Sequence, residues 1–359
     1  MSGFNASLQL EDFDDFYFNY TDIPNTTFVI DQSTVACQPV AISDAINAAV
    51  CVFYTIVFLL AIPGNLVVGF VIGRNRQSLT PSEVYLFHLM VADTLLALVL
   101  PFYATSLVRG WLFGDWVCKL VSLVKEANFY TSILFLACIS MDRYMVIVRA
   151  MEARRAQRRL CSWVVCGSVW VLGLLLSLPA LYNEVFSLKV SDPQICAERF
   201  ATDSADEWRL ATRIMRHVLG FLLPLAFMLT CYSVTVARLL RTRGFRRQKA
   251  MRLIVAVVAA FLFCWTPFHL ATIADTLLRA KLVENTCYKR NVVDVTMFAT
   301  QSLGLLHCCV NPVLYAFVGE KFRTRFSQML YKSGLRDRSS VLKSPRSTSQ
   351  TLEPMSNLF

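Results

Sequence analysis

Seven long apolar runs constrain the fold of this chain more than any other feature. Each has the roughly 20 residues that a helix needs to cross about 30 Å of hydrocarbon. The composition agrees, because 55% of the 359 residues are hydrophobic and only 17% are charged, whereas soluble domains average about 25% charged residues. The sequence therefore predicts an all-α membrane protein with a seven-helix transmembrane bundle. The runs lie at 47–73, 83–108, 118–147, 159–181, 213–239, 250–278 and 294–317.

The distribution of charge predicts the orientation. Residues 1–73 contain seven acidic residues and no basic ones, so residues 74–359 carry +17 of formal charge although the whole chain carries +10. Basic links stay in the cytoplasm, which places the N-terminus outside. The first helix is expected to act as its own insertion signal, since the pattern of a cleavable signal peptide is absent. The links after runs 1, 3, 5 and 7 hold Arg74, Arg76, Arg149, Arg154, Arg155, Arg158, Arg159, Arg238, Arg241, Arg243, Arg246, Arg247, Lys249, Arg252, Lys321, Arg323 and Arg325.

The cysteines predict two extracellular disulfides. Eight of the twelve fall inside apolar runs and are expected to be small core residues. The other four lie in segments expected to face the oxidising outside and should pair, although four cysteines allow three pairings. No metal-ligand spacing and no hydrolase motif occurs, so we expect no enzymatic activity and no catalytic residue. The four are Cys37, Cys118, Cys196 and Cys287.

The N-terminal arm is acidic and aromatic, as "EDFDDFYFNYTD" (11–22) shows. Its charge would attract a basic partner and raise the encounter rate. The alternative is an arm that is merely disordered and soluble. Asp14 and Asp15 lie close to Tyr17 and Tyr20, a setting typical of tyrosine sulfation, which would add strong acceptors for Lys and Arg. Three sequons predict glycosylation at one or more of Asn5, Asn19 and Asn25.

Polar residues inside the runs indicate functional positions, because ionisable groups in a bilayer need partners. Asp93 lies in the middle of run 2. Lys125 lies two turns into run 3, where it would face a cavity, pair with Glu126 or another acid, or extend to the interface. Pro267, beside Trp265 in run 6, removes a backbone hydrogen bond and permits a kink.

An ordered set of short motifs gives the chain a family resemblance. Each motif alone is weak, but their order and spacing resemble those of rhodopsin-like G-protein-coupled receptors across the whole membrane region. The motifs are Gly64-Asn65, "LMVAD" (89–93), Cys118, "DRY" (142–144), Trp170, Pro224 with Tyr232, "FCWTP" (263–267) and "NPVLY" (311–315).

Finer features resemble those of chemokine receptors: Leu100-Pro101, "WLFG" (111–114), "HCCVNPVLYAF" (307–317), and the places of Cys37 and Cys287. Within that family the chain is most similar to the interleukin-8 receptors, which bind CXC chemokines. This similarity covers roughly 40–330. The matching stretches are "SLVKEANFY" (122–130), "WRLATRI" (208–214), "ADTLLR" (274–279) and "LGLLHCCVNP" (303–312).

The resemblance implies a plasma-membrane receptor for a basic chemokine whose N-terminus carries a Glu-Leu-Arg triplet. It implies the pairings Cys118–Cys196 and Cys37–Cys287. It also implies two ligand contacts, one through the acidic arm and one through a pocket. Charges at helix ends that simply extend to water are the alternative for the pocket. The expected ligand-binding residues are Asp14, Asp15, Tyr17, Tyr20, Lys125, Arg209, Arg213, Asp275, Arg279, Asp294 and Gln301.

The resemblance further implies signalling through inhibitory heterotrimeric G proteins, calcium release and chemotaxis of neutrophils. In the resting state Arg143 would pair with Asp142, and on activation it would meet the G protein. A sodium ion is implied at Asp93, Asn128, Ser132 and Asn311, an oxygen-rich set that suits a hard cation; a protonated or water-bonded Asp93 is the alternative. The switch residues are Asp142, Arg143, Tyr144, Tyr232, Trp265, Pro267, Asn311, Pro312 and Tyr315.

The expected organisation is an extracellular arm (1–46), the seven-helix domain (47–317), an amphipathic cytoplasmic helix (318–331) and a disordered tail (332–359). Basic inner loops would contact acidic lipid, G protein or both. Phosphorylation of the tail by receptor kinases would create acidic clusters for arrestin. We expect no nucleic-acid partner. The candidate phosphorylation sites are Ser339, Ser340, Ser344, Ser347, Thr348, Ser349 and Thr351.

Three departures from the interleukin-8 receptor pattern leave alternatives open. Gln301 stands where those receptors have a Glu that faces the pocket, which puts one ligand charge contact in doubt. Val99 replaces a Thr, and "DRYMVIV" (142–148) replaces "DRYLAIV". The runner-up is an atypical scavenger receptor that binds and internalises chemokine without activating a G protein. The intact Asp142-Arg143-Tyr144 argues against this alternative and predicts G-protein coupling, whereas the altered "MVIV" leaves the alternative open. A transporter or channel would need paired repeats or a line of ionisable residues, and the sequence shows neither.

Overall fold

The structure is a computed structural model. It describes residues 43–74, 79–149, 155–187, 193–200, 204–240, 245–280, 282–284, 286–318 and 320–332. All of them belong to the unit Ala41–Phe359. The N-terminal arm and the C-terminal tail therefore lie outside the described residues.

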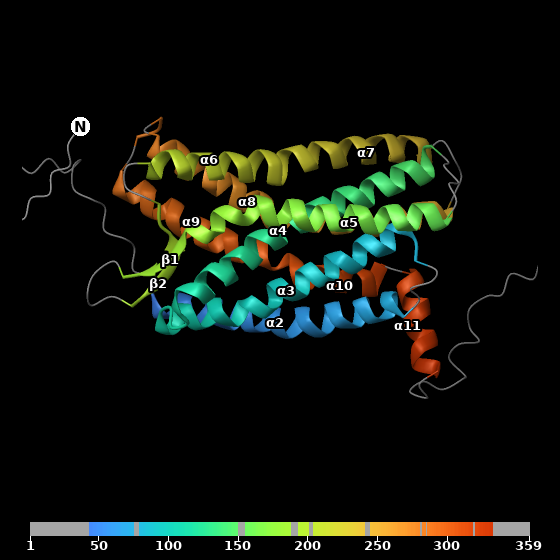
Figure 1. The fold of residues 1–359 in the computed structure, drawn as a ribbon, viewed down its shortest axis with the longest axis horizontal. Helices are drawn as coiled ribbons and strands as arrows, with labels where there is room; N and C mark the ends of the chain where they lie inside the picture. The colour runs from blue at the N-terminus through green and yellow to red at the C-terminus, as the bar shows by residue number, and fades with distance from the viewer. Residues whose placement is uncertain are drawn as a thin grey trace, which may run out of the picture. The chain divides into compact units, whose positions relative to one another are not determined.

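Seven helices of the described chain are long and apolar enough to cross a membrane, which confirms the predicted fold class (Figure 1). The first three are α2 (Asp44–Gly73), α3 (Pro81–Arg109) and α4 (Gly114–Ile147). The fourth is α5 (Arg155–Ser177), which continues into the short 3₁₀-helix η3 (Leu178–Tyr182). The remaining spans contain α6 (Ala205–His217) with η4 (Val218–Leu222) and α7 (Leu223–Leu240), α8 (Phe245–Arg279), and α9 (Cys287–Leu305) with α10 (His307–Val318).

Local sequence signals explain where several helices begin and end. Ser43 caps α2 by accepting a hydrogen bond from the Ile46 amide. At the start of α3 the Thr80 amide donates to the Glu83 carboxylate at 2.8 Å, and Pro81 follows as the first helical residue. That helix ends at Gly110, whose φ of 73° is accessible mainly to glycine.

Two helices depart from regular α geometry. The fifth span contains a π-turn, η4, directly before Pro224, and such insertions occur frequently at functional sites. The seventh span breaks at Leu306, between α9 and α10. The chain also contains a two-stranded antiparallel ribbon, β1 (Asn183–Phe186) and β2 (Ile195–Glu198), which was not predicted from the sequence.

The bundle has a buried interior and an apolar outer surface. Leu59, Leu66 and Phe70 of α2 are each more than half exposed, which suits contact with lipid. One interior cluster packs around Phe135, Phe261 and Trp265. A second packs around Leu96, Leu100 and Trp111.

The two ends of the bundle carry different elements (Figure 1). The ribbon β1–β2 lies at the end where α6 and α9 begin, which we call the outer end because it is predicted to be extracellular. The last helix, α11 (Glu320–Lys332), lies at the opposite end and runs across the direction of the spans. Arg325 of α11 pairs with Glu83 of α3 at 2.9 Å, which holds α11 against the bundle.

Candidate functional site

An ion cluster at the outer end joins α6 to α8. Arg213 Nη2 of α6 lies 2.5 Å from Asp275 Oδ2 of α8, and Arg213 Nη1 donates to Thr276 Oγ1 at 2.9 Å. Arg279 Nε donates to the same oxygen, Asp275 Oδ2, at 2.8 Å. The Asp275 side chain is 1% exposed, and its Oδ1 has no partner among the described residues. Two arginines therefore share one carboxylate, which leaves the triad with a net positive charge.

Two more predicted ligand residues differ in their relation to this triad. Asp294 of α9 is half-buried and within electrostatic reach of Asp275 and Arg279. Arg209 instead pairs with Asp206, one turn away in α6, at 3.2 Å and near the helix start. The structure thus brings Asp294 to the triad and leaves Arg209 outside it.

A second buried ion pair joins α6, α4 and the ribbon. Arg216 Nε lies 3.2 Å from Glu126 Oε2, and Arg216 Nη2 lies 3.1 Å from Glu126 Oε1, so the pair is bidentate. Arg216 Nη2 also lies 3.6 Å from Glu198 Oε1 on β2. Arg216 was not predicted from the sequence to be a site residue. The spacing of Arg209, Arg213 and Arg216 on one helical face was the signal that could have indicated it.

Lys125 differs from Arg213 and Arg216 because it forms no ion pair within the described part of the chain. Its ammonium lies over the Tyr103 ring, 5.4 Å from the centroid. Glu126, one of its predicted partners, binds Arg216 instead. Close by, Tyr54 and Ser302 share a hydrogen bond of 2.8 Å between α2 and α9, and Gln301 is the half-buried neighbour of Ser302. Lys125 is therefore a half-buried cation that is available to an anion.

The ribbon is fixed over the outer end by covalent and hydrogen bonds. Cys118 of α4 and Cys196 of β2 form a disulfide, as predicted from the resemblance. Trp111 N donates to Gln194 O at 2.7 Å, and a Cβ on Gly110 would lie only 2.7 Å from Pro193 Cβ. The "WLFG" loop therefore packs directly against the strand that carries Cys196.

The second predicted disulfide has one of its two cysteines, Cys287, among the described residues. Cys287 is disulfide-bonded, and Cys37 lies outside the described residues, so the Cys37–Cys287 pairing stays a prediction. The nearby Lys289 Nζ donates to Glu284 Oε2 at 2.9 Å, and this hydrogen bond lowers the pKa of the exposed Glu284 carboxyl.

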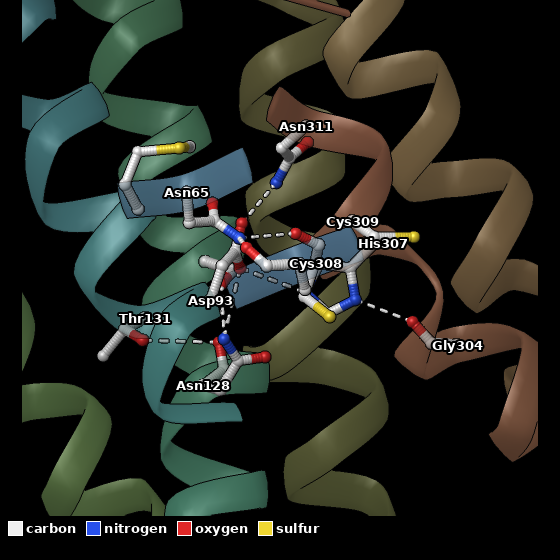
Figure 2. A network of polar contacts seen from close by, with 12 residues as sticks. Asn65, Asp93, Asn128, Thr131, Gly304, His307, Cys308, Cys309 and Asn311 are labelled. Carbon is white, nitrogen blue, oxygen red and sulfur yellow. Dashed lines mark hydrogen bonds and ion pairs between the residues drawn. The ribbon is translucent and has the colours of Figure 1, made fainter. Parts of the chain in front are cut away.

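A polar network lies at the centre of the bundle (Figure 2). Asp93 is fully buried and accepts hydrogen bonds from Asn311 Nδ2 at 2.7 Å and from Asn128 Nδ2 at 3.3 Å. Asn128 Nδ2 also lies 3.3 Å from Ser132 Oγ. The four residues predicted to hold sodium therefore come together from three spans.

His307 also belongs to this network, although it was not predicted from the sequence. Its Nδ1 donates to the Gly304 carbonyl at 2.7 Å, because a carbonyl can only accept. Its Nε2 then faces Asp93 Oδ1 at 3.6 Å (Figure 2). Its place in "HCCVNP", four residues before the expected sodium ligand Asn311, was the available signal.

The donor set fits a sodium ion. Asp93 supplies a carboxylate and Ser132 a hydroxyl, and Asn128 Oδ1 is a buried oxygen without a partner among the described residues. Hard cations prefer such oxygen ligands. Asp93, Ser132 and Asn128 could therefore hold sodium, with the Asn311 amide orienting the carboxylate.

The Asn65 side chain supplies a hydrogen-bond donor in place of the backbone N–H that Pro312 lacks. In a regular helix the Cys308 carbonyl would accept from residue 312, but proline has no N–H. Asn65 Nδ2 donates to that carbonyl instead, at 2.8 Å. The adjacent Gly64 permits the approach, because a Cβ there would lie 2.9 Å from Pro312 Cγ. The Gly64-Asn65 motif thus serves the "NP" motif of another helix.

Three of the remaining switch residues lie on the fifth and sixth spans. Trp265 is buried, with its ring centroid 4.8 Å from that of Phe129 and 5.7 Å from that of His307. Tyr232 is buried in the interior cluster around Phe261. Pro267 lies inside α8, two residues after Trp265.

At the inner end, Arg143 donates to Ser82 Oγ of α3. Asp142 is buried and Tyr144 is half-buried. The Tyr315 side chain lies outside the described residues, as do Asp14, Asp15, Tyr17, Tyr20 and the sequons at Asn5, Asn19 and Asn25. The predicted resting pair of Arg143 with Asp142 stays a prediction.

Comparison with known proteins agrees with this arrangement. The family model described as "7 transmembrane receptor (rhodopsin family)" matches residues 64–315. C-X-C chemokine receptor type 1 of Oryctolagus cuniculus is 42% identical over 325 residues, covering 90% of this chain and 89% of the relative. C-X-C chemokine receptor type 2 of Homo sapiens is 42% identical over 339 residues, covering 94% and 91%. The chain therefore belongs to the rhodopsin family of seven-transmembrane receptors and, within it, to the C-X-C chemokine receptors.

Proposed function

We propose that this receptor binds basic CXC chemokines that carry an N-terminal Glu-Leu-Arg triplet. We further propose that it signals through inhibitory heterotrimeric G proteins to calcium release and chemotaxis. The observation that carries the proposal is the triad of Arg213, Asp275 and Arg279, in which two arginines share one carboxylate.

The charge of the triad suits a ligand with both signs of charge. A ligand glutamate would bind the arginine charge that Asp275 leaves unbalanced. A ligand arginine would find the free Oδ1 of Asp275 and the neighbouring carboxylate of Asp294. Lys125 offers a further cation deeper in α4. The acidic arm, 11–22, would capture the basic body of the chemokine first and raise its encounter rate.

Ligand binding at the triad would reach the inner end through α8. Arg213 ties α6 to Asp275, ten residues after Trp265 in α8. Competition by a ligand carboxylate would loosen this tie and bias α8 between two arrangements about Pro267. Arg143 would then leave Ser82 and meet the G protein. A sodium ion at Asp93 would supply positive charge that stabilises the resting arrangement.

The test is inhibitory-G-protein or calcium signalling in transfected cells with a Glu-Leu-Arg chemokine, on wild type and on Arg213→Ala. We expect the substitution to raise the half-maximal chemokine concentration at least about tenfold, since a charged hydrogen bond contributes about 1.5–3 kcal/mol. Lys289→Ala is the matched control, because it removes an exposed ion pair at the same end.

Three outcomes distinguish a signalling chemokine receptor from a scavenger and from a receptor for a different ligand. A wild-type response that Arg213→Ala weakens and Lys289→Ala leaves unchanged supports the proposal. A wild type that binds and internalises the chemokine but stays silent is a scavenger, as the "DRYMVIV" departure would allow. A wild type that does not bind the chemokine refutes the ligand assignment. Phosphorylation of the tail and arrestin recruitment, which we propose for regulation, are measured in the same cells.

A further inference from the structure

Two histidines face each other between α6 and α8, below the ion clusters described above. His217 is the last residue of α6, and His269 lies in α8 two residues after Pro267. Their Nδ1 atoms are 2.7 Å apart, and their ring centroids are 4.9 Å apart. Since one Nδ1 must accept, at least one of the two rings is neutral.

The rings are held in place by aromatic packing. Phe221 stacks on His269 with a centroid separation of 4.1 Å, and the Phe129 ring lies 5.7 Å from His269. The π-turn η4 begins directly after His217 and contains Phe221. Gly220, in the same turn, lies against Tyr130 and Phe129 so closely that a Cβ would be 2.6 Å from the latter. These contacts hold the His269 ring against the π-turn that follows His217.

The hydrogen bonding of the pair is incomplete. Both Nε2 atoms are buried and have no partner among the described residues. In the neutral pair, one Nδ1–H donates to the other Nδ1, so one Nε2 is left as an unpaired acceptor and the other as an unpaired donor. Unpaired buried polar atoms are unfavourable. The Nε2 atoms are therefore left for water or another polar group, and the two Nδ1 atoms, which face each other, are the ligand positions that the pair offers.

We propose that His217 and His269 form a binding site for a divalent transition metal, with Zn²⁺ as its probe, which bridges α6 and α8. Neutral imidazole is the commonest metal ligand and suits zinc and copper. Two Nδ1 atoms on one tetrahedral Zn²⁺ lie roughly 3.3 Å apart, so the rings need to separate by a few tenths of an ångström. The shared Nδ1 proton moves to Nε2 of the same ring, and no net proton is released.

The remaining coordination positions belong to water or to a ligand group. Among the described residues, no group of three or more His, Cys, Asp or Glu side chains could hold a metal. The site therefore has only two protein ligands and keeps open positions. Of the cations nearest in sequence, Arg216 is balanced by the Glu126 carboxylate, and Arg213 shares the Asp275 carboxylate with Arg279. Arg213, Arg216 and His217 lie on one face of α6, because Arg216 and His217 follow Arg213 by three and four residues.

The test measures metal binding by purified full-length receptor and does not depend on the proposed chemokine. Zn²⁺ is titrated while the melting temperature is followed, with Mg²⁺ as a control because it prefers oxygen ligands. We expect Zn²⁺, and not Mg²⁺, to raise Tm of the wild type by at least about 2 °C. His217→Gln and His269→Asn should weaken Zn²⁺ binding at least tenfold, whereas His217→Cys, which restores a zinc ligand, should retain it.

His88→Gln is the matched control, because His88 lies elsewhere and bonds Trp170. Equal Zn²⁺ shifts in the wild type and the His217 and His269 variants, or no shift in the wild type, would overturn the proposal. A second measurement uses the unaltered protein in case a variant fails to fold. X-ray absorption spectroscopy of the Zn²⁺-loaded wild type should show two imidazole nitrogens at about 2.0–2.1 Å from the metal. A spectrum without imidazole nitrogens around the metal would contradict the site.

Discussion

At the scale of single residues, the outer pocket depends on how charges are shared. Asp275 pairs with two arginines from two helices, while Lys125 lies over the Tyr103 ring and forms no ion pair with the residues that the structure describes. The sequence placed these residues at the correct ends of their helices, because charges collect where apolar runs end. It did not predict that Glu126 would bind Arg216 in preference to the adjacent Lys125, because that choice depends on which side chains face each other across helices.

Replacing Asp275 tests this sharing. Asp275→Asn leaves Arg213 and Arg279 close together without their common carboxylate. We expect a less stable receptor and a chemokine response that needs at least about tenfold more ligand. Thermal unfolding and dose–response curves measure the two effects. Glu284→Gln is the control, because Glu284 is fully exposed, and an equal loss in that variant would contradict the assignment.

The buried pair of Arg216 and Glu126 gives a second prediction. Removing either partner, as Arg216→Gln or Glu126→Gln, leaves a buried charge and should cost about 3 kcal/mol. The double variant should cost clearly less than the sum of the two, since neither charge then stays unpaired. Unfolding of all four proteins measures the coupling. Additive losses would show that the two side chains do not act as a pair.

At the scale of elements, the sequence predicted the spans well and the irregular segments poorly. Long apolar runs predict transmembrane helices because a helix satisfies its own backbone in lipid. The ribbon β1–β2 has four residues in each strand, too few for a sequence pattern. The fifth span begins at Ala205 and not at 213, because its first turns are charged and extend beyond the apolar run.

The contact between α2 and α10 gives a matched pair of variants. Gly64→Ala places a Cβ within 2.9 Å of Pro312 Cγ, so we expect lower stability and altered signalling. At Gly69 a Cβ meets nothing within 4 Å, and Gly69→Ala should stabilise its helix by about 0.5–1 kcal/mol. Melting temperatures of the two variants measure the difference. Equal effects would exclude a close helix contact at Gly64.

At the scale of the whole molecule, the outer end is built from parts that are distant in sequence. The disulfide Cys118–Cys196 spans 78 residues and holds β2 against α4. Four cysteines could be predicted to be extracellular from the sequence, but their pairing required the family resemblance, because four cysteines allow three pairings. The Asp93 network was expected for the same reason, and His307 was missed because a single histidine in an apolar run has no distinctive pattern.

Loss of the Cys118–Cys196 disulfide should lower chemokine binding more than it lowers insertion of the receptor into the membrane. Cys196→Ser frees β2, and we expect chemokine affinity to fall more than tenfold. Cys161→Ser, which replaces an exposed free cysteine, should leave affinity unchanged. Radioligand binding, corrected for receptor at the cell surface, measures the effect. An unchanged affinity in Cys196→Ser would show that the ribbon does not shape the pocket.

The acidic arm gives a prediction about rates. Neutralising the acids of 11–22 should lower the association rate of a basic chemokine at least about tenfold and reduce its dependence on salt. A scrambled 11–22 segment with the same composition should keep the fast association, because a long-range field depends on total charge. Surface plasmon resonance at several salt concentrations measures both. A scrambled arm that binds as slowly as the neutral one would indicate specific contacts instead.

The donation from Asn65 to the Cys308 carbonyl has a mechanical consequence. At Pro312 the seventh span lacks one of the bonds that make a helix stiff, and the replacement belongs to a different helix. The bending rigidity of the seventh span near Pro312 therefore depends on a side chain of α2. A small displacement of α2 would weaken the hydrogen bond from Asn65 and make the seventh span easier to bend near Pro312, without breaking any hydrogen bond within that span. The flexibility of the seventh span near Pro312 is therefore coupled to the position of α2.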